Sequence, residues 1–155
     1  MTTVECAGER FMHAPDVQGP MAARTAELIK AEKPDVIMIG GPPFYLGGFK
    51  VDEMQLKRGV ENLKSVIEVA EVTILEHHVL RDELWRQRAE PLYESALKAG
   101  HRLVTAAEFA GEKNLFLESR RKQLYKESPP STEFLQWTRE SEARISHIKP
   151  PIGDT

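Results

Sequence analysis

Three loops that follow the expected strands of this 155-residue chain contain the side chains with the most capacity for chemistry. Their sequences are APDVQGP from Ala14, GGPPFYLGG from Gly40 and EHHVLRD from Glu76. In an open α/β sheet, ligands bind beyond the carboxyl ends of the strands, where such loops meet. The chemistry of this chain is therefore expected in these loops.

Carboxylate and imidazole groups of the first and third loops could bind a divalent metal. Asp16 is most simply a turn residue, because Asp shortly before Gly-Pro accepts backbone N–H groups or caps a helix. Glu76, His77 and His78 are either exposed at a strand end or ligands for zinc, manganese or iron. Because adjacent strand residues face opposite sides, at most one histidine is expected to face a given site, unless the strand has ended.

The Gly-Pro loop favours a rigid wall over a phosphate cradle. Pro42 and Pro43 lack the N–H donors that such cradles use, and neither GxxxxGK[ST] nor GxGxxG spacing is present. Phe44 and Tyr45 could present aromatic surface to a substrate, or the whole loop could simply pack on the core as the strand leaves the sheet. Arg81 in the third loop could bind an anionic group of that substrate.

The remaining polar residues have simpler interpretations. Asp82 could orient a histidine or cap the following helix. His101 and His147 have no neighbouring ligands in the sequence and are expected to be structural or surface residues. The segment ESRRKQLYK at 118–126 is most simply the solvated face of a helix, and otherwise the first place to seek phosphate contacts. Cys6 is the only cysteine, which excludes an internal disulfide and a CxxC metal site.

The overall composition is that of an ordinary globular domain. With a formal net charge of -3 and 29% charged residues, the chain has no polybasic surface that would require nucleic acid or anionic lipid. Its apolar runs are too short to cross a bilayer, and no basic-then-apolar leader opens the sequence. We therefore expect a cytoplasmic protein with no membrane partner.

Hydrophobic periodicity in the first half of the chain predicts strands that alternate with helices. A hairpin is expected on either side of the turn at 7–9, followed by a helix over 20–33 and a buried strand before Gly40. Helical spacing continues over 54–70, and strand chemistry returns over 72–78. This order indicates right-handed crossovers and a parallel sheet with covering helices, an α/β fold.

The second half is expected to complete the sheet and to end in a separate segment. Residues 82–100 are helical in pattern, with Pro91 forcing a kink or a restart and Gly100 as the C-cap, before a short strand at 102–105. One more helix is expected over 114–127. We assign residues 1–127 to one domain and residues 128–155 to a linker and tail. An amphipathic docking helix could form in the tail, with the apolar residues Phe134, Leu135, Trp137 and Ile145. The closing segment KPPIGDT has no pattern that would order it.

Four blocks in register carry a resemblance to a known family. HAPDVQGP, IGGPPFYLGG, VTILEHHVLRD and LVTAAEFAGEKNLFLESRRKQLY resemble, in the same order, the C-terminal half of an archaeal family of predicted metal-dependent hydrolases in the metallo-β-lactamase superfamily. The resemblance covers about residues 2–126. It implies half of an αββα sandwich, a mixed sheet with flanking helices, in which Asp16 bridges two metals and His77 or His78 ligates one of them. Hydrolysis of a phosphoester or of RNA is the implied activity.

The resemblance also implies that most of the metal ligands lie elsewhere. The HxHxDH run of that superfamily is absent from these residues, and a catalytic zinc takes about three protein ligands. We therefore expect weak metal binding by the chain alone, and an N-terminal half, from the same gene or a separate subunit, that supplies HxHxDH. One sheet face is expected to lack a partner, so the chain could form a homo-oligomer. The alternatives are a non-catalytic binding or assembly module and, less favoured because helices are few, a free-standing flavodoxin-like binder.

Overall fold

The computed structural model describes residues 1–143 of the chain. Two compact units divide the chain, Met1–Ser119 and Arg120–Thr155, and each is described by itself. None of the helices within the described residues is long and apolar enough to cross a membrane.

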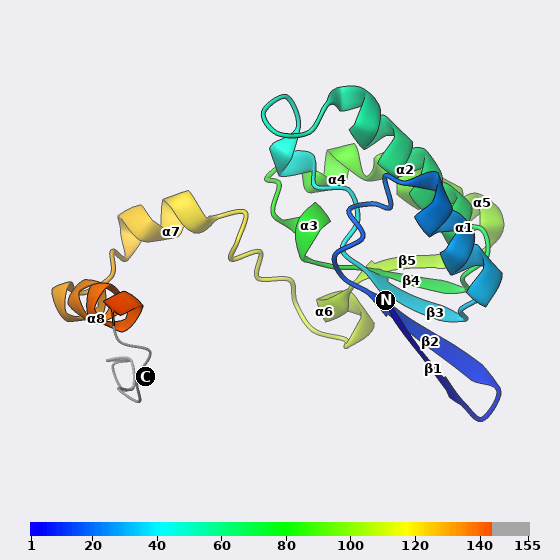
Figure 1. Cartoon of the computed structure of the whole chain (residues 1–155), viewed down its shortest axis with the longest axis horizontal. Coiled ribbons are helices and arrows are strands. Elements are labelled where there is room, and N and C mark those ends of the chain that lie inside the picture. The colour runs from blue at the N-terminus through cyan, green and yellow to red at the C-terminus, as the bar shows by residue number, and fades with distance from the viewer. Residues whose placement is uncertain (144–155) are drawn as a thin grey trace. The chain divides into compact units, whose positions relative to one another are not determined.

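The first unit is built on a five-stranded mixed sheet in which the strands follow one another in chain order (Figure 1). The hairpin of β1 (Thr2–Cys6) and β2 (Glu9–Ala14) is antiparallel, and β3 (Val36–Ile39), β4 (Val72–Leu75) and β5 (Arg102–Thr105) continue parallel to β2. The predicted α/β class, the terminal hairpin and the strand at 102–105 are therefore confirmed.

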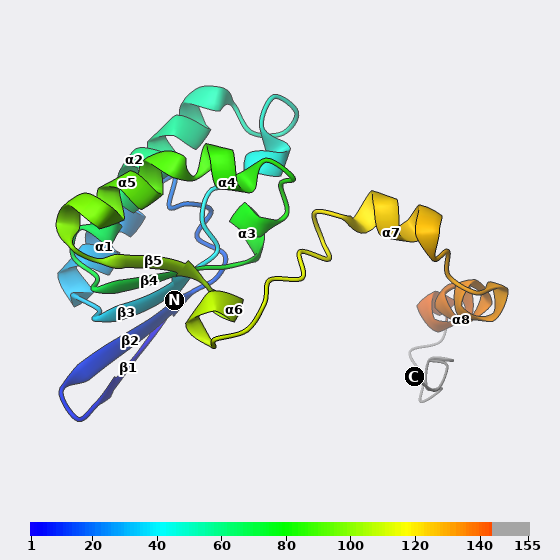
Figure 2. The ribbon, with the colours of Figure 1, turned by 180° about the vertical axis from the view of Figure 1, so that it is seen from behind.

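Four helices cover one face of this sheet (Figures 1 and 2). They are α1 (Ala23–Glu32), α2 (Glu53–Ile67), α4 (Trp85–Arg88) and α5 (Glu90–Ala99). Alternate residues of the strands point under them and are almost completely buried. These core residues are Met12, Ala14, Ile37, Ile39, Leu75 and Leu103.

The opposite face of the sheet is apolar but largely uncovered. In register across β1 to β4, Val4, Phe11, Val36 and Val72 form one apolar row of this open face, and their side chains are half-buried or exposed. On β5 the row ends with the exposed Arg102. Within the first unit, only the short helix α6 (Ala106–Phe109) lies on this side, where it contacts β4 (Figure 2). Within the first unit, this face of the sheet therefore has no layer of helices like the one on the opposite face.

Several predicted boundaries are wrong, because long-range hydrogen bonds decide them. Helix α1 begins at Ala23, not at Pro20, since the side chain of Asn62 on α2 donates to the carbonyls of Pro20 and Met21 and holds this segment as a turn. The end of α1 is as predicted, with Lys33 in the left-handed conformation just before Pro34.

Strand β4 ends at Leu75, so the predicted strand over 72–78 is three residues too long. The chain turns into the one-turn helix α3 (His77–Leu80), because the N–H of Val79 donates to the carbonyl of Gly40 at 3.0 Å. This hydrogen bond holds α3 against Gly40, the residue that follows β3. His77 and His78 consequently belong to a helical turn.

The predicted helical segment 82–100 is a pair of helices. Helix α5 restarts at Glu90 with Pro91 in its first turn, and Gly100 caps its end at φ 73°. The helix predicted over 114–127 is half wrong: only α7 (Arg121–Glu127) is helical. Residues 114–120 are irregular, because Phe116 packs its ring 5.4 Å from that of Trp85.

The second unit contains α7 and α8 (Thr132–Ala143). Side chains of α7 are mostly exposed, as expected for a solvated helix. On α8, the rings of Phe134 and Trp137 are 5.7 Å apart. Docking of this helix remains a prediction, and the expectations for Ile145, His147 and KPPIGDT lie outside the described residues.

The difference between the two sheet faces predicts unequal costs of truncating neighbouring residues on β3. Ile37→Ala, under the helices, should lower the free energy of unfolding by about 2 to 5 kcal/mol, whereas Val36→Ala, on the open face, should cost less than about 1 kcal/mol. Urea unfolding of both variants measures this difference. Equal losses would show that the open face is already covered in solution.

Candidate metal centre

Asp16, His77 and His78 meet at the carboxyl edge of the sheet, although about sixty residues separate them in sequence. Asp16 lies in the turn after β2, and the histidines open α3 directly after β4. Both strands pair in parallel with β3, through Ala14 opposite Ile39 and Ile39 opposite Leu75. The loops that leave β2 and β4 therefore start at the same level.

The geometry of these three side chains suits a single metal ion. Asp16 Oδ1 lies 3.5 Å from Nε2 of His77 and 3.5 Å from Nε2 of His78. Bonds of about 2.1 Å to a tetrahedral zinc place ligand atoms about 3.4 Å apart. In the described part of the chain, this is the one group of three His, Cys, Asp or Glu side chains whose ligand atoms converge in this way.

Both histidines face the cluster because β4 has already ended before them. Consecutive residues of a helical turn are about 100° apart rather than on opposite faces, and the centroids of the two imidazole rings are 4.2 Å apart, with the rings tilted by 60°. The expectation of a single inward histidine held only for residues within a strand, and β4 ends at Leu75, so it does not apply to this pair. The cluster thus offers three ligands instead of two.

Burial differs strongly across the cluster. His78 is 8% exposed, His77 is half-buried, and the side chain of Asp16 is 78% exposed. The surrounding protein thus covers the imidazole of His78 and part of that of His77, while the carboxylate of Asp16 is exposed to solvent. This opening leaves room for a further ligand or a substrate.

Gly40 allows the three loops to approach one another. A Cβ atom at this position would clash with the carbonyl oxygen of Pro15 and would lie 3.0 Å from Nδ1 of His78. Its backbone also bridges the loops: the N–H of Gly40 donates to the carbonyl of Ala14, and its carbonyl accepts from Val79. A glycine is therefore required here by close approach.

Burial lowers the pKa of His78, because desolvation disfavours the charged imidazolium. The neighbouring His77 lowers this pKa further, and the carboxylate of Asp16 opposes both effects in part. The neutral imidazole is the form that binds metals. His78 is accordingly kept in its ligand form at neutral pH.

The aromatic-proline loop is mostly part of the core. Pro42, Pro43 and Phe44 are buried, which favours the simpler of the two interpretations, a strand exit packed on the core. Tyr45 alone of these four residues has an exposed side chain, at the surface of the short 3-10 helix η1 (Phe44–Leu46). Its hydroxyl accepts a hydrogen bond from Nη1 of Arg81 at 3.3 Å.

Arg81 stands one helical turn after His77 and places a cation beside the cluster. Its guanidinium lies 5.7 Å from the ring of Tyr45, and its Nε lies 3.6 Å from Oε2 of Glu118. The charge of Arg81 is close enough to lower the pKa of His78. The carboxylate of Glu118 thus occupies the position beside Arg81 where an anionic group of a substrate could bind.

Asp82 and His101 serve the fold. The carboxylate of Asp82 accepts a hydrogen bond from the N–H of Leu84 at 2.8 Å and lies 3.6 Å from Nε of Arg88, so it stabilises the start of α4. Nδ1 of His101 lies 2.7 Å from the carbonyl oxygen of Ile67, which confirms its structural role.

Sequence reasoning missed one residue near the cluster, His13 on β2, and left open what Glu76 does. Oε2 of Glu76 lies 3.5 Å from Nδ1 of His77 and 3.8 Å from Nε2 of His13. The signal was available in the two-residue period of β2, which places His13 on the same face as Phe11. Its proximity to Glu76 depends on strand register, which the sequence does not state.

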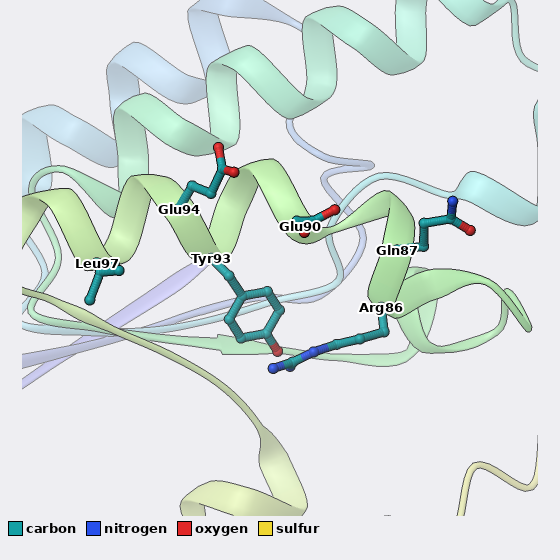
Figure 3. Close-up of a pocket in the computed structure, with 6 residues that line it drawn as sticks. All are labelled: Arg86, Gln87, Glu90, Tyr93, Glu94 and Leu97. Carbon is teal, nitrogen blue, oxygen red and sulfur yellow. The ribbon is translucent and has the colours of Figure 1, made fainter.

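A hollow with a volume of about 640 Å³ is lined by residues of α4 and α5 (Figure 3). Inside it, the guanidinium of Arg86 stacks 3.8 Å from the ring of Tyr93, whose pKa is raised by burial. The lining residues are Arg86, Gln87, Glu90, Tyr93, Glu94 and Leu97. None of them belongs to the metal cluster.

The fold and the cluster together define an α/β protein with a candidate metal centre at the carboxyl edge of its sheet. Among known proteins, the chain is similar to archaeal proteins named UPF0282. It is 38% identical over 122 residues to that of Pyrobaculum neutrophilum, which covers 78% of this chain and 38% of the relative. With the Saccharolobus solfataricus protein SSO3251 it shares 38% identity over 113 residues, 72% of this chain and 37% of the relative.

A more distant relative, from Korarchaeum cryptofilum, is 29% identical over 130 residues, 83% of this chain and 44% of its own length. The chain therefore aligns with less than half the length of each of these relatives. No family model and no solved structure matches it. The names of the relatives state no activity.

The lowered pKa of His78 predicts that the fold is less stable in acid. Because the unfolded imidazole, with a pKa near 6.5, takes up a proton before the folded one, stability is complete above pH 6.5 and declines as the pH falls through the lowered pKa. His78→Gln should make this decline shallower. Urea unfolding at pH 7.5 and pH 5.5 with a chelator measures it; identical pH dependence in both proteins would contradict the assignment.

Proposed function

We propose that the chain is the C-terminal half of a binuclear metal-dependent hydrolase of the metallo-β-lactamase type, acting on a phosphoester. The convergence of Asp16, His77 and His78 at metal-ligand spacing is the observation that carries this proposal. The resemblance of four sequence blocks, in register, to that superfamily supports it.

Asp16 and both histidines would hold the first ion. Two imidazoles, one carboxylate and an open position match the number of protein ligands at a catalytic zinc, and the same donors suit manganese or iron. The exposed carboxylate of Asp16 has a second oxygen that can bind a second ion. The remaining ligands of that ion would come from an HxHxDH segment outside these residues.

A divalent metal in this position supplies Lewis-acid chemistry by polarising a phosphoryl oxygen. The residues of this chain would bind and orient the substrate around it. Arg81, steadied by the hydroxyl of Tyr45, offers a guanidinium to a phosphoryl oxygen, a pairing that its planar donors favour. Glu118 must then yield its place beside Arg81.

The open face of the sheet gives the missing half a place to pack. Val4, Phe11, Val36 and Val72 present apolar surface there, and a second layer would remove that surface from water. The relatives are long enough to contain such a layer, because the aligned region is 38% of the first relative's length. The metal cluster lies at the edge of the same sheet.

A second candidate function is a non-catalytic binding or assembly module. The same open face favours it, since an apolar sheet surface can bind a partner without any chemistry. Metal-independent association with a partner, with no hydrolysis, is the result that distinguishes this function.

Titration of the isolated chain with zinc should show one ion bound per chain. Asp16→Asn and His78→Ala should each weaken this binding by at least about tenfold, because each removes one of three ligands. Exposed Glu112 supplies a matched control, Glu112→Gln, which should bind zinc as the unaltered chain does. Isothermal titration calorimetry measures all four proteins, and equal affinity in every variant would refute the site.

Mixing the chain with an HxHxDH-bearing companion segment should produce metal-dependent hydrolysis of bis(p-nitrophenyl) phosphate. Asp16→Ala should abolish this activity, because Asp16 would bridge the two ions. The companion alone is the control for background hydrolysis. Stable association without activity, unaffected by a chelator, would support the binding module instead.

A further inference from the structure

The carboxylate of Glu76 lies next to the metal cluster, beside the Nδ1 atom of His77, and has no role in the hydrolysis proposed above. Glu76 connects β4 to α3, and its backbone is already fixed: its N–H donates to the carbonyl of Ile39 at 2.9 Å and its carbonyl accepts from Leu80. Its Oε2 atom is buried without a hydrogen-bond partner among the described residues. Burial of an unsatisfied carboxylate oxygen is costly, so its placement here needs an explanation.

This oxygen faces the imidazole of His77 on the side away from the cluster. Glu76 Oε2 lies 3.5 Å from Nδ1 of His77, whereas Asp16 Oδ1 lies 3.5 Å from Nε2 of the same ring. The imidazole is therefore held between two carboxylates, one at each nitrogen. On the far side of Glu76, Nε2 of His13 approaches the same oxygen at 3.8 Å.

We propose that Glu76 is a positioning residue that fixes the ring orientation and the tautomer of His77 for metal binding. A neutral imidazole carries its single proton on one nitrogen. A proton on Nδ1 would lie on the side of the ring that faces Glu76, where Oε2 is 3.5 Å away, and the lone pair of Nε2 would then be free for a metal ion at the cluster. This inference rests on the metal function proposed above.

The second histidine of the cluster is held differently. Nδ1 of His78 is buried without a hydrogen-bond partner in the described structure, and its ring packs against Gly40. Packing thus orients His78, and a carboxylate orients His77. His13 lies in register with Met38 and Ile74 across the sheet, which brings it beside Glu76, two residues beyond Ile74 on the same face.

The tautomer of His77 tests this inference without any metal. Long-range 1H–15N spectra of the metal-free chain should show His77 protonated at Nδ1, and Glu76→Ala, which removes the acceptor, should shift the proton to Nε2. A His77 protonated at Nε2 in the unaltered chain would overturn the assignment. Because no metal is present, this result stands apart from the fate of the proposed hydrolase.

Zinc affinity supplies the second readout. Glu76→Gln should weaken zinc binding by about 10- to 100-fold, the usual effect of removing a carboxylate that orients a ligating histidine. Glu71, exposed at the opposite end of β4, gives the matched control Glu71→Gln, whose affinity should not change. Unchanged affinity in Glu76→Gln would overturn the inference. Absence of zinc binding by the unaltered chain, with His77 still protonated at Nδ1, would refute the metal function and with it the positioning role, while the tautomer assignment alone would stand.

Discussion

The parallel register of β2, β3 and β4 is the constraint on which the candidate site depends. Ala14, Ile39 and Leu75 are paired side by side, so the three loops that follow leave the sheet at one level. Backbone hydrogen bonds of Gly40 then tie the loops together, to Ala14 on one side and Val79 on the other. Three ligand atoms from distant parts of the sequence converge as a result.

The one-sided arrangement of the helices links the architecture to the chemistry. The covered face holds the core, while the open face runs up to His13 and Glu76 at the edge where the metal cluster lies. In the first unit, one face of the sheet therefore lacks a layer of helices, and the carboxylate of Asp16 is exposed to solvent.

Much of the secondary structure was predictable, because strand and helix periods are local properties of a sequence. The errors fall where distant contacts decide the conformation. Asn62 holds Pro20 outside α1, the bond from Val79 to Gly40 ends β4 early, and the contact with Trp85 leaves Phe116 in an irregular segment. Local propensity contains no information about any of these three contacts.

The sequence by itself determined the α/β class, the three loops that carry chemistry, and the types of side chain available there. It left Asp16 as a turn residue on local grounds, and only a resemblance spanning several blocks joined it to the histidines. Tertiary structure decided that both His77 and His78 face Asp16, and that Glu76 and His13 stand behind them. The physical reason is that these relations depend on strand register and on where a strand ends, which hydrogen bonds between distant residues fix.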